Sequence, residues 1–285
     1  MIVKNKEKNF VRKFSGVLET YDRNKLKKSC IKAGASEIIA DKIVKEFEEK
    51  FLYNGITTKE IHDRIYELLE KESLTLSSKY RLKEAMMKLG PEGFHFEDFF
   101  ARIMEHYGYK TRLRNLVRGR CALHEIDIMA EKNVSGKVCR CMIECKYHNS
   151  PGIYTGLKEA LYTYARFLDL KDGWHNGLCE NFDEAWLVTN TKFSEEAKAY
   201  IECKGIKAVG WKYPKGQGLE ILIENKTLYP ITVLKSVNKE QLRRFSEINI
   251  IIIKDILKKS VEELVNTTGI PKGEILILKN EVKNF

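Results

Sequence analysis

Several patterns that identify common protein classes are missing from this sequence. The amino-terminal residues carry no apolar stretch behind their charges, so we expect no secretory signal. The longest aliphatic run, Ile250 to Ile253, is far shorter than the roughly 20 residues that a membrane helix needs. Seven cysteines, an odd number spread along the chain, do not indicate a disulfide framework. We therefore expect reduced thiols in a cytoplasmic protein with no membrane contact.

Two motifs for metal and nucleotide chemistry are also missing. No glycine loop ends in Lys-Ser or Lys-Thr, so we do not expect a P-loop that hydrolyses nucleotides. No Cys-x-x-Cys pair occurs, and Cys139, Cys141 and Cys145 fall along one predicted strand. Sulfurs spaced by about 6.6 Å per two residues are too far apart for a tetrahedral zinc site. We interpret these thiols as packing residues.

The positive charge of the chain is unevenly distributed. Its 285 residues carry a net charge of +10, of which residues 1–90 contribute +6, residues 91–230 contribute +1 and residues 231–285 contribute +3. Within the middle segment, five basic residues fall in an eleven-residue stretch without a carboxylate: Lys110, Arg112, Arg114, Arg118 and Arg120. This stretch is predicted to be a basic loop, either simply solvated or in contact with phosphates. The length suggests two domains or three small ones.

Residues 1–90 are predicted to form a short strand-like start and then helices. Asp22, Ser36 and Thr57 are expected to begin helices, the last with Glu60 in a capping box. A fourth helix is expected over residues 78–89, and the following Gly90-Pro91 is the strongest candidate for a domain boundary.

This segment resembles the ATP-cone family of helical, nucleotide-binding regulatory domains. The resemblance rests on five stretches: residues 11–16, residues 21–26, Ala33-Gly34, residues 55–58 and Tyr80-Arg81. It implies that Lys13 and Lys25 contact the phosphates of ATP or dATP. The family usually has a basic-acidic pair where Phe14-Ser15 stands in this chain.

The middle segment is predicted to be an α/β domain. An apolar helix is expected over residues 93–107 and a sheet-covering helix over residues 157–168, in which Arg166 and Asp169 suggest a structural pair. Strands are expected over residues 124–130, 137–147, 185–189 and 205–210. The first two form a hairpin, and the alternation of strands and helices indicates a mixed sheet.

The hairpin carries the residues with the clearest chemistry. Glu144 and Lys146 share one face of the second strand, and a turn centred between Val134 and Ser135 would pair Asp127 with Met142, diagonally from Glu144. Two carboxylates beside an amine suit a divalent cation and a phosphate. The alternative is a solvated strand face with an ordinary ion pair. Glu97, on an apolar helix face, either joins this site or forms a salt bridge at the border of that face.

Residues 91–230 resemble the Mrr-type branch of the PD-(D/E)xK nucleases. The matching stretches are residues 93–97, Gly108-Tyr109, residues 125–127, residues 143–146, residues 188–190 and Phe193-Ser194. The resemblance implies a restriction-endonuclease-like α/β/α fold that cleaves DNA with Mg²⁺ or Mn²⁺. It assigns Asp127, Glu144 and the Cys145 carbonyl to the metal and Lys146 to catalysis, with Glu97 often joining the site. His148 and Asn149 would touch the scissile phosphate, and Arg112, Arg114, Arg118 and Arg120 are candidate DNA contacts.

The tail, residues 231–285, is predicted to be helical. Residues 254–264 and 268–271 resemble half of a helix-hairpin-helix module, which implies contact with the DNA backbone. The alternative is a packing or dimerisation unit.

Together these patterns predict an α/β protein of three parts: a mainly helical ATP cone over residues 1–90, a restriction-endonuclease-like α/β/α core with a mixed sheet over residues 91–230, and a small helical tail. We expect a Mg²⁺-dependent endodeoxyribonuclease that is regulated by ATP or dATP and forms homo-oligomers. The alternative is a catalytically silent, nucleotide-responsive DNA-binding regulator.

Overall fold

The computed structural model describes residues 9–13, 16–90, 95–150, 152–283 and 285. The chain divides into two compact units, one that runs up to Lys83 and one from Glu84 to Lys283. Pro91, from the expected boundary at Gly90-Pro91, lies outside the described residues, as do Phe14 and Ser15. The division into three parts at residues 90 and 230 stays a prediction.

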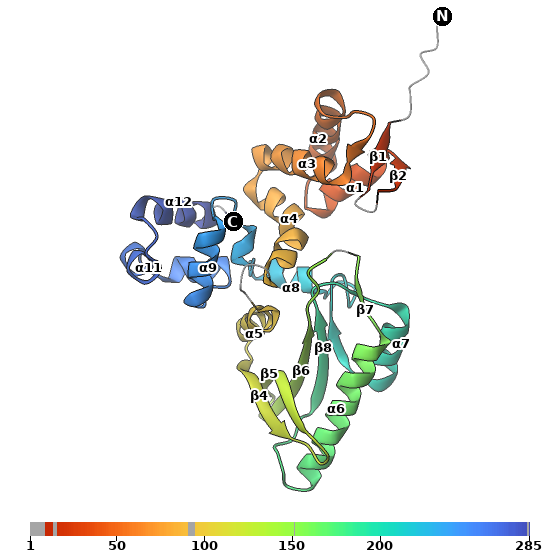
Figure 1. Cartoon of the computed structure of the whole chain (residues 1–285), viewed down its shortest axis with the longest axis vertical. Helices are drawn as coiled ribbons and strands as arrows, with labels where there is room; N and C mark the ends of the chain where they lie inside the picture. The colour runs from red at the N-terminus through yellow and green to blue at the C-terminus, as the bar shows by residue number, and fades with distance from the viewer. Residues whose placement is uncertain (1–8, 14–15, 91–94, 151, 284) are drawn as a thin grey trace, which may run out of the picture. The chain divides into compact units, whose positions relative to one another are not determined.

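The first unit combines a small sheet with a group of helices (Figure 1). Its central strand β1 pairs antiparallel with β2 and parallel with β3. The elements are β1 (Phe10–Arg12), β2 (Leu18–Thr20), α1 (Arg23–Lys32), α2 (Glu37–Lys50), β3 (Ile56–Thr57), α3 (Thr58–Glu72) and α4 (Leu74–Lys88), which continues into the second unit.

The helix starts in this unit follow the sequence. The Asp22 side chain accepts a hydrogen bond from the Lys25 amide at 3.1 Å, and Ser36 caps α2. Thr57 and Glu60 form the predicted capping box at the start of α3. Each cap satisfies an amide that has no partner inside the helix, which fixes the first residue of the helix.

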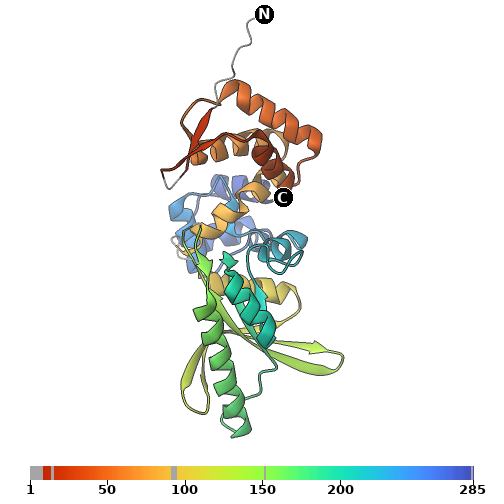
Figure 2. The ribbon, with the colours of Figure 1, turned by 90° about the vertical axis from the view of Figure 1, so that its right-hand side faces the viewer.

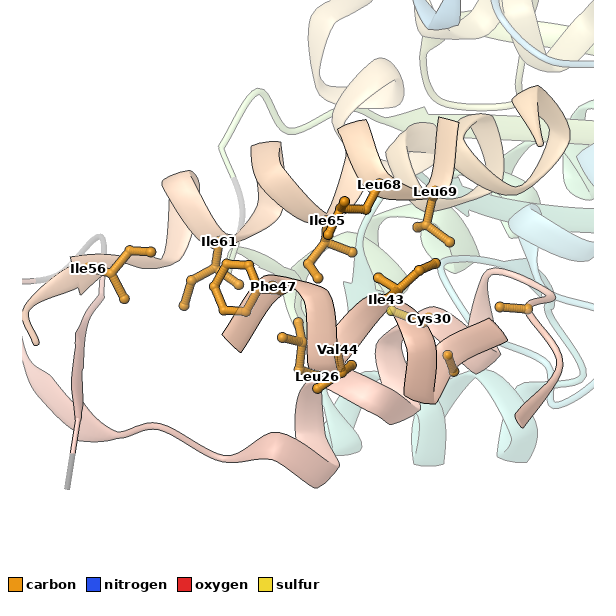
Figure 3. Packing of buried hydrophobic residues seen from close by; sticks show 12 residues of the cluster. Leu26, Cys30, Ile43, Val44, Phe47, Ile56, Ile61, Ile65, Leu68 and Leu69 are labelled. Carbon is orange, nitrogen blue, oxygen red and sulfur yellow. The ribbon is translucent and has the colours of Figure 1, made fainter. Parts of the chain in front are cut away.

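The apolar faces of α1, α2 and α3 converge on one core. Figure 3 shows Cys30, Ile43, Phe47 and Ile65 pointing toward one another from these helices. All four side chains are no more than 1% exposed. The amphipathic helices therefore bury their apolar faces against each other, which supplies most of the stability of a small helical unit.

The second unit is built on a five-stranded mixed sheet with the strand order β10-β8-β6-β5-β4. Strands β4, β5 and β6 are antiparallel, whereas β8 pairs parallel with β6 and β10 pairs parallel with β8. The strands are β4 (Lys110–Arg118), β5 (Leu123–Val134), β6 (Lys137–Lys146), β8 (Glu184–Thr189) and β10 (Lys207–Val209), with β7 (Tyr154–Thr155) and β9 (Lys192–Phe193) forming a separate pair.

Helices cover both faces of this sheet. Both views show α6 lying along the sheet, and Figure 1 shows α5 on the opposite side from α6. The helices of this part are α5 (Phe96–His106), α6 (Leu157–His175), α7 (Glu195–Lys204) and α8 (Leu219–Asn225). The expected α/β/α arrangement with a mixed sheet is confirmed.

One predicted element is wrong. The basic stretch that begins at Lys110 is not a loop but the edge strand β4, which pairs with β5 over nearly its whole length. Its side chains alternate between exposed and half-buried, so the arginines at Arg112, Arg114 and Arg118 occupy the exposed side. The basic residues suggested a loop, although the residues of this stretch alternate with the period of two that a half-buried strand requires.

The tail is helical, as expected, and belongs to the second compact unit. It consists of a 3-10 turn η2 (Ile231–Val233) and the helices α9 (Lys239–Glu247), α10 (Ile253–Lys258), α11 (Val261–Thr268) and α12 (Lys272–Lys283). The buried Asp255 of α10 accepts a hydrogen bond from Arg102 of α5 at 2.8 Å. No helix in the described part of the chain is long and apolar enough to cross a membrane.

Candidate active site

The site forms where the hairpin of β5 and β6 opens at the end away from its turn. Ser135 and Gly136 turn the chain with φ values of +53° and +85°, the pair of positive values that a two-residue hairpin turn needs. The ladder then pairs Val134 with Lys137 and continues to Ile128 opposite Ile143. The next step in this register places Asp127 opposite Glu144.

The predicted hairpin register is therefore wrong by two residues. The turn was expected between Val134 and Ser135, which would have set Asp127 opposite Met142. Because side chains alternate with period two, this shift leaves Asp127 and Glu144 on the same face. It also makes them direct neighbours, and directly opposed residues have Cβ atoms only about 4.5–5.5 Å apart.

Asp127 accepts a hydrogen bond from a backbone amide at the end of the β5–β6 ladder. The Cys145 N–H donates to the Asp127 carboxylate at 2.6 Å. Burial and the neighbouring Glu144 charge raise the pKa of Asp127 to about 6, although the Cys145 hydrogen bond works in the opposite direction. The two carboxylates repel each other in partly buried surroundings, so a cation between them would be stabilised.

Glu144 is only 3% exposed and is held by two cations. Lys146 Nζ donates to Glu144 Oε1 at 2.6 Å, and Arg166 Nη1 from α6 donates to Glu144 Oε2. The hydrogen bond and charge of Glu144 outweigh burial and raise the pKa of Lys146, which keeps this amine protonated. Each carboxylate oxygen has two lone pairs, so Glu144 retains acceptor capacity for a further ligand.

Arg166 is a site residue that the sequence analysis missed. Besides Glu144, its guanidinium donates to the Glu125 carbonyl at 2.7 Å and to the Tyr162 hydroxyl at 2.6 Å. The helical spacing could have indicated this role, since Arg166 lies on the sheet-facing side of α6 with Ala160, Thr163 and Leu170. A cation on a buried stripe requires a buried anion.

The expected pairing of Arg166 with Asp169 is wrong. Asp169 accepts instead from His124 Nε2 at 2.7 Å, from the Cys121 amide at 2.8 Å and from the Ala122 amide at 3.1 Å. These hydrogen bonds lower the pKa of Asp169 despite the opposing effect of burial. The carboxylate therefore fastens the connection between β4 and β5.

Glu97 lies in the first turn of α5 but is already partnered. Arg114 bridges Glu97 Oε1 at 3.2 Å and Asp98 Oδ1 at 3.0 Å, so the salt bridge considered for Glu97 is present. The Glu97 charge nevertheless contributes to the raised pKa of Asp127. The carboxylate oxygens of Glu97, Asp127 and Glu144 do not all lie within 4.8 Å of one another. Asp127 and Glu144 are thus brought together directly, and Glu97 acts at longer range.

The backbone of Arg114 is unusual at the same point. In the register of β4 and β5, Arg114 stands opposite Asp127. The paired residues of β4 pass from Leu113 to Asn115, so Arg114 is left out of the ladder. Its φ of +51° is in the left-handed region, where a residue with a side chain is strained. Such strain often marks a functional site because the surrounding structure must hold it in place.

The remaining arginine candidates for DNA contact are Arg112 and Arg118 of β4 and Arg120, which follows that strand. Arg112 pairs with Glu180 at 2.7 Å, so like Arg114 it is not a free phosphate contact. The side chains of Arg118 and Arg120 are exposed. All four arginine candidates for DNA contact are thus exposed, and two of them, Arg112 and Arg114, form ion pairs with carboxylates.

His148 and Asn149 follow β6 directly. The His148 amide donates to Asn190 Oδ1 at 2.9 Å, the Asn190 amide returns a hydrogen bond to the His148 carbonyl at 2.8 Å, and His148 Nε2 lies 3.0 Å from Thr155 Oγ1. Burial and Lys146 lower the pKa of His148, so the imidazole is neutral near pH 7. Asn149 is exposed. Asn190 and Thr155, both fully buried, were missed as supports of this segment.

The candidate nucleotide residues line a cavity in the first unit. This cavity, of about 420 Å³, is bordered by Lys13, Tyr21, Lys25 and Tyr80, among others. Glu19 lies between the two lysines, 2.5 Å from Lys13 Nζ and 3.4 Å from Lys25 Nζ. The structure therefore brings the two lysines to one cavity, with a carboxylate between them.

The geometric argument against closely spaced cysteine sulfurs is wrong for one pair. Cys139 Sγ, Cys141 Sγ and a carboxylate oxygen of Glu184 all lie within 4.8 Å of one another. Side-chain rotation brings the thiols closer than the Cα spacing along the strand implies. Cys145 does not belong to this group, and all seven cysteines are free.

Comparisons with known proteins match three parts of the chain. Residues 9–82 match the ATP cone domain, residues 90–212 match the restriction endonuclease model Mrr_cat, and residues 229–285 match the model of the AF1548-like C-terminal region. A curated protein of Archaeoglobus fulgidus, described as uncharacterized, is 46% identical over 164 residues, which cover 58% of this chain and 87% of that protein. The crystal structure of AF1548, a protein of unknown function, is 42% identical and covers 66% of this chain and 94% of that chain, with a TM-score of 0.54.

Proposed function

Because the chain belongs to the AF1548-like family and joins an ATP cone to a restriction endonuclease-like domain, we propose that it is a metal-dependent endodeoxyribonuclease controlled by ATP or dATP. The observation that carries this proposal is the pairing of half-buried Asp127 with buried Glu144, with Lys146 beside them. Two carboxylates and an amine at the open end of a hairpin suit a phosphodiester better than any neutral substrate.

The donor set fits a hard divalent cation. Asp127 and Glu144 supply oxygen ligands of the kind that Mg²⁺ and Mn²⁺ prefer, and the Cys145 carbonyl would add a third. Burial and the neighbouring Glu144 raise the pKa of Asp127, as expected where two carboxylates lie side by side. When bound, the metal would activate water and neutralise charge on the phosphate.

Lys146 has an electrostatic role in this proposal. Glu144 raises the pKa of Lys146 against the opposing effect of burial, which favours the charged amine. Lys146 can donate a hydrogen bond to a phosphate oxygen and stabilise the charge that develops there. Arg166 fixes the Glu144 carboxylate from the other side, so Lys146 and Glu144 keep a defined geometry. Glu97 adds negative charge at longer range.

The substrate contacts follow from the exposed polar groups near this end of the sheet. Arg118 and Arg120 are free to meet backbone phosphates, and Arg112 and Arg114 could do so on leaving their carboxylate partners. The clamp by Asn190 holds the His148 backbone, so His148 and Asn149 can approach the scissile phosphate in a fixed position. The helical tail provides a further surface for the DNA backbone or for a second copy of the chain in a homo-oligomer.

A nicking assay tests the reaction. The wild type is expected to cut supercoiled plasmid with Mg²⁺ or Mn²⁺, and Asp127→Ala and Lys146→Ala are expected to lose at least about 10²-fold in rate. Lys137→Ala is the matched control, because Lys137 is an exposed lysine at the far end of the same strand. Equal activity of Lys146→Ala and Lys137→Ala would contradict the assignment of the site.

Nucleotide binding is tested separately in the first unit. Titration calorimetry with ATP and dATP should show binding by the wild type and weaker binding by Lys13→Ala and Lys25→Ala. Lys28→Ala is the control, since Lys28 is exposed on the same helix as Lys25 but does not line the cavity. Adding nucleotide to the nicking assay then shows whether the reaction rises or falls.

The alternative function is a catalytically silent regulator that binds DNA in response to nucleotide. It is favoured by one observation: both oxygens of Glu144 already accept from cations. A purified protein that binds DNA but cuts no DNA form with any metal or nucleotide would support this alternative and contradict the nuclease.

A further inference from the structure

A second group of ligating side chains lies at the other end of β6 from the candidate active site. Cys139 and Cys141 share one face of β6, and Glu184 opens the neighbouring strand β8, directly paired with Cys141. Among the residues that the structure describes, these three form the one group whose ligand atoms all lie within 4.8 Å of one another. The proposed nuclease reaction does not use them.

The spacing of these atoms fits a tetrahedral metal. Cys141 Sγ lies 3.6 Å from Glu184 Oε2. With Zn–S bonds of about 2.3 Å and Zn–O bonds of about 2.1 Å, the S–O edge of a tetrahedron is also about 3.6 Å. The two atoms therefore need little movement to share one ion.

The surroundings support the carboxylate in a ligand orientation. Trp186 Nε1 donates to Glu184 Oε2 at 2.8 Å, which is the kind of outer hydrogen bond that orients a metal ligand. Cys141 is fully buried and Cys139 is half-buried, so the sulfurs are shielded while one side stays accessible. Tyr109 and Trp186 are in edge contact, with ring centroids 6.5 Å apart.

Packing alone explains these residues less well. Without a metal, the Cys141 thiol donates only a weak S–H hydrogen bond to Glu184. A small apolar residue would fill the same place on the strand without drawing a carboxylate toward it. Two thiols and a carboxylate together are the donor set of a borderline-soft cation.

We propose that Cys139, Cys141 and Glu184 bind one Zn²⁺ ion that joins β6 to β8. On binding, both thiols would release their protons to solvent, and the ion, two thiolates and the carboxylate would carry a net charge of −1. Three protein ligands leave the fourth position to a water molecule. The ion would link two strands that are far apart in the sequence, and the site is independent of the Mg²⁺ chemistry proposed for Asp127 and Glu144.

Cadmium titration of the whole protein tests this site, because the thiolate-to-metal charge-transfer band reports only on sulfur ligands. The protein is first freed of metal with a chelator and kept reduced. The wild type is expected to show a band that saturates at one ion per chain, and Zn²⁺ added to the metal-free protein should raise the melting temperature. Cys139→Ser and Glu184→Gln are expected to weaken binding at least about tenfold, and these two half-buried positions avoid the fully buried Cys141.

Two controls make the outcome decisive. Cys203→Ser removes an exposed thiol on α7 and should leave the band unchanged, and Asp127→Asn should leave it unchanged as well. A wild type without a saturable band, or a band of the same strength and affinity in Cys139→Ser, would overturn the proposal. Because the readout involves no DNA cleavage, its failure is distinguishable from failure of the nuclease.

Discussion

Replacing Arg166 by Met tests how the candidate active site is held together. Methionine keeps the approximate length and apolar character of the arginine stem but removes the guanidinium. Three hydrogen bonds are then lost, to Glu144 Oε2, to the Glu125 carbonyl and to the Tyr162 hydroxyl. Glu144, at 3% exposed, keeps Lys146 as its one remaining cationic partner.

The size of the effect follows from this partial loss. Removing one partner of a buried ion pair costs about 3–5 kcal/mol, because the other charge stays buried without compensation. Since Lys146 still neutralises Glu144 Oε1, we expect the lower end, about 3 kcal/mol, for Arg166→Met. The double variant Glu144→Gln with Arg166→Met should recover about 1–2 kcal/mol of this, because the buried side chain that loses the guanidinium is then uncharged.

Urea unfolding followed by tryptophan fluorescence measures this free energy. Trp174, Trp186 and Trp211 all lie in the second compact unit, so the signal does not report on the ATP cone. Arg118→Met is the matched control, since Arg118 is exposed on β4, and it should change the free energy of unfolding by less than about 0.5 kcal/mol.

Two results would refute the reasoning about Arg166. The first is a cost for Arg166→Met that equals the cost of the surface control. The second is a double variant that loses the full sum of the two single effects, since additive losses would mean that Arg166 and Glu144 do not interact.

Three further predictions concern other parts of the same unit. The pKa of Asp127 is about 6 in the folded protein against about 3.9 in the unfolded chain, so ionising this carboxyl costs stability above pH 4. Asp127→Asn should therefore be more stable than the wild type by about 2 kcal/mol at pH 7.5, and the difference should vanish near pH 4. A variant that is less stable at pH 7.5 would contradict this. The lowered pKa of Asp169 has the opposite sign, so its contribution is present above pH 4 and lost in acid. Asp169→Asn should therefore lose about 2 kcal/mol at pH 7 by urea unfolding, and little in acid. Gly136→Ala should cost about 1–2 kcal/mol in the same assay because its φ of +85° lies in the left-handed region, and an unchanged midpoint would count against the observed turn.

Local chemistry made much of the fold predictable from the sequence. Asp22, Ser36 and Thr57 begin helices because their side chains satisfy nearby amides, which is a property of a few adjacent residues. The shared face of Glu144 and Lys146 follows from the period of a strand, and their contact at 2.6 Å agrees with it.

Longer-range features could not be predicted in the same way. The hairpin register depends on which residues take positive φ. Ser135 with Gly136 displaced the expected turn by one residue, which shifted each cross-strand partner by two. The partner of Arg166 depends on where α6 lies over the sheet, and no spacing within the helix determines this. The edge strand β4 was missed because its exposed arginines dominated its composition. The residues assigned to metal, DNA and nucleotide stay predictions.

Helix α5 is fastened at both ends to different parts of the second unit. Its first turn carries Glu97 and Asp98, bridged by Arg114, and its later turns carry Arg102, which holds Asp255 of the tail. The Tyr107 hydroxyl, just past the helix, donates to the Leu222 carbonyl at 3.0 Å. Because α5 is a short helix held at both ends, a shift at one end would move the other. The tail helix α10 and the edge strand β4 are therefore both joined to α5 by ion pairs, and a change at Asp255 would alter the support of the helix that Arg114 holds at its first turn.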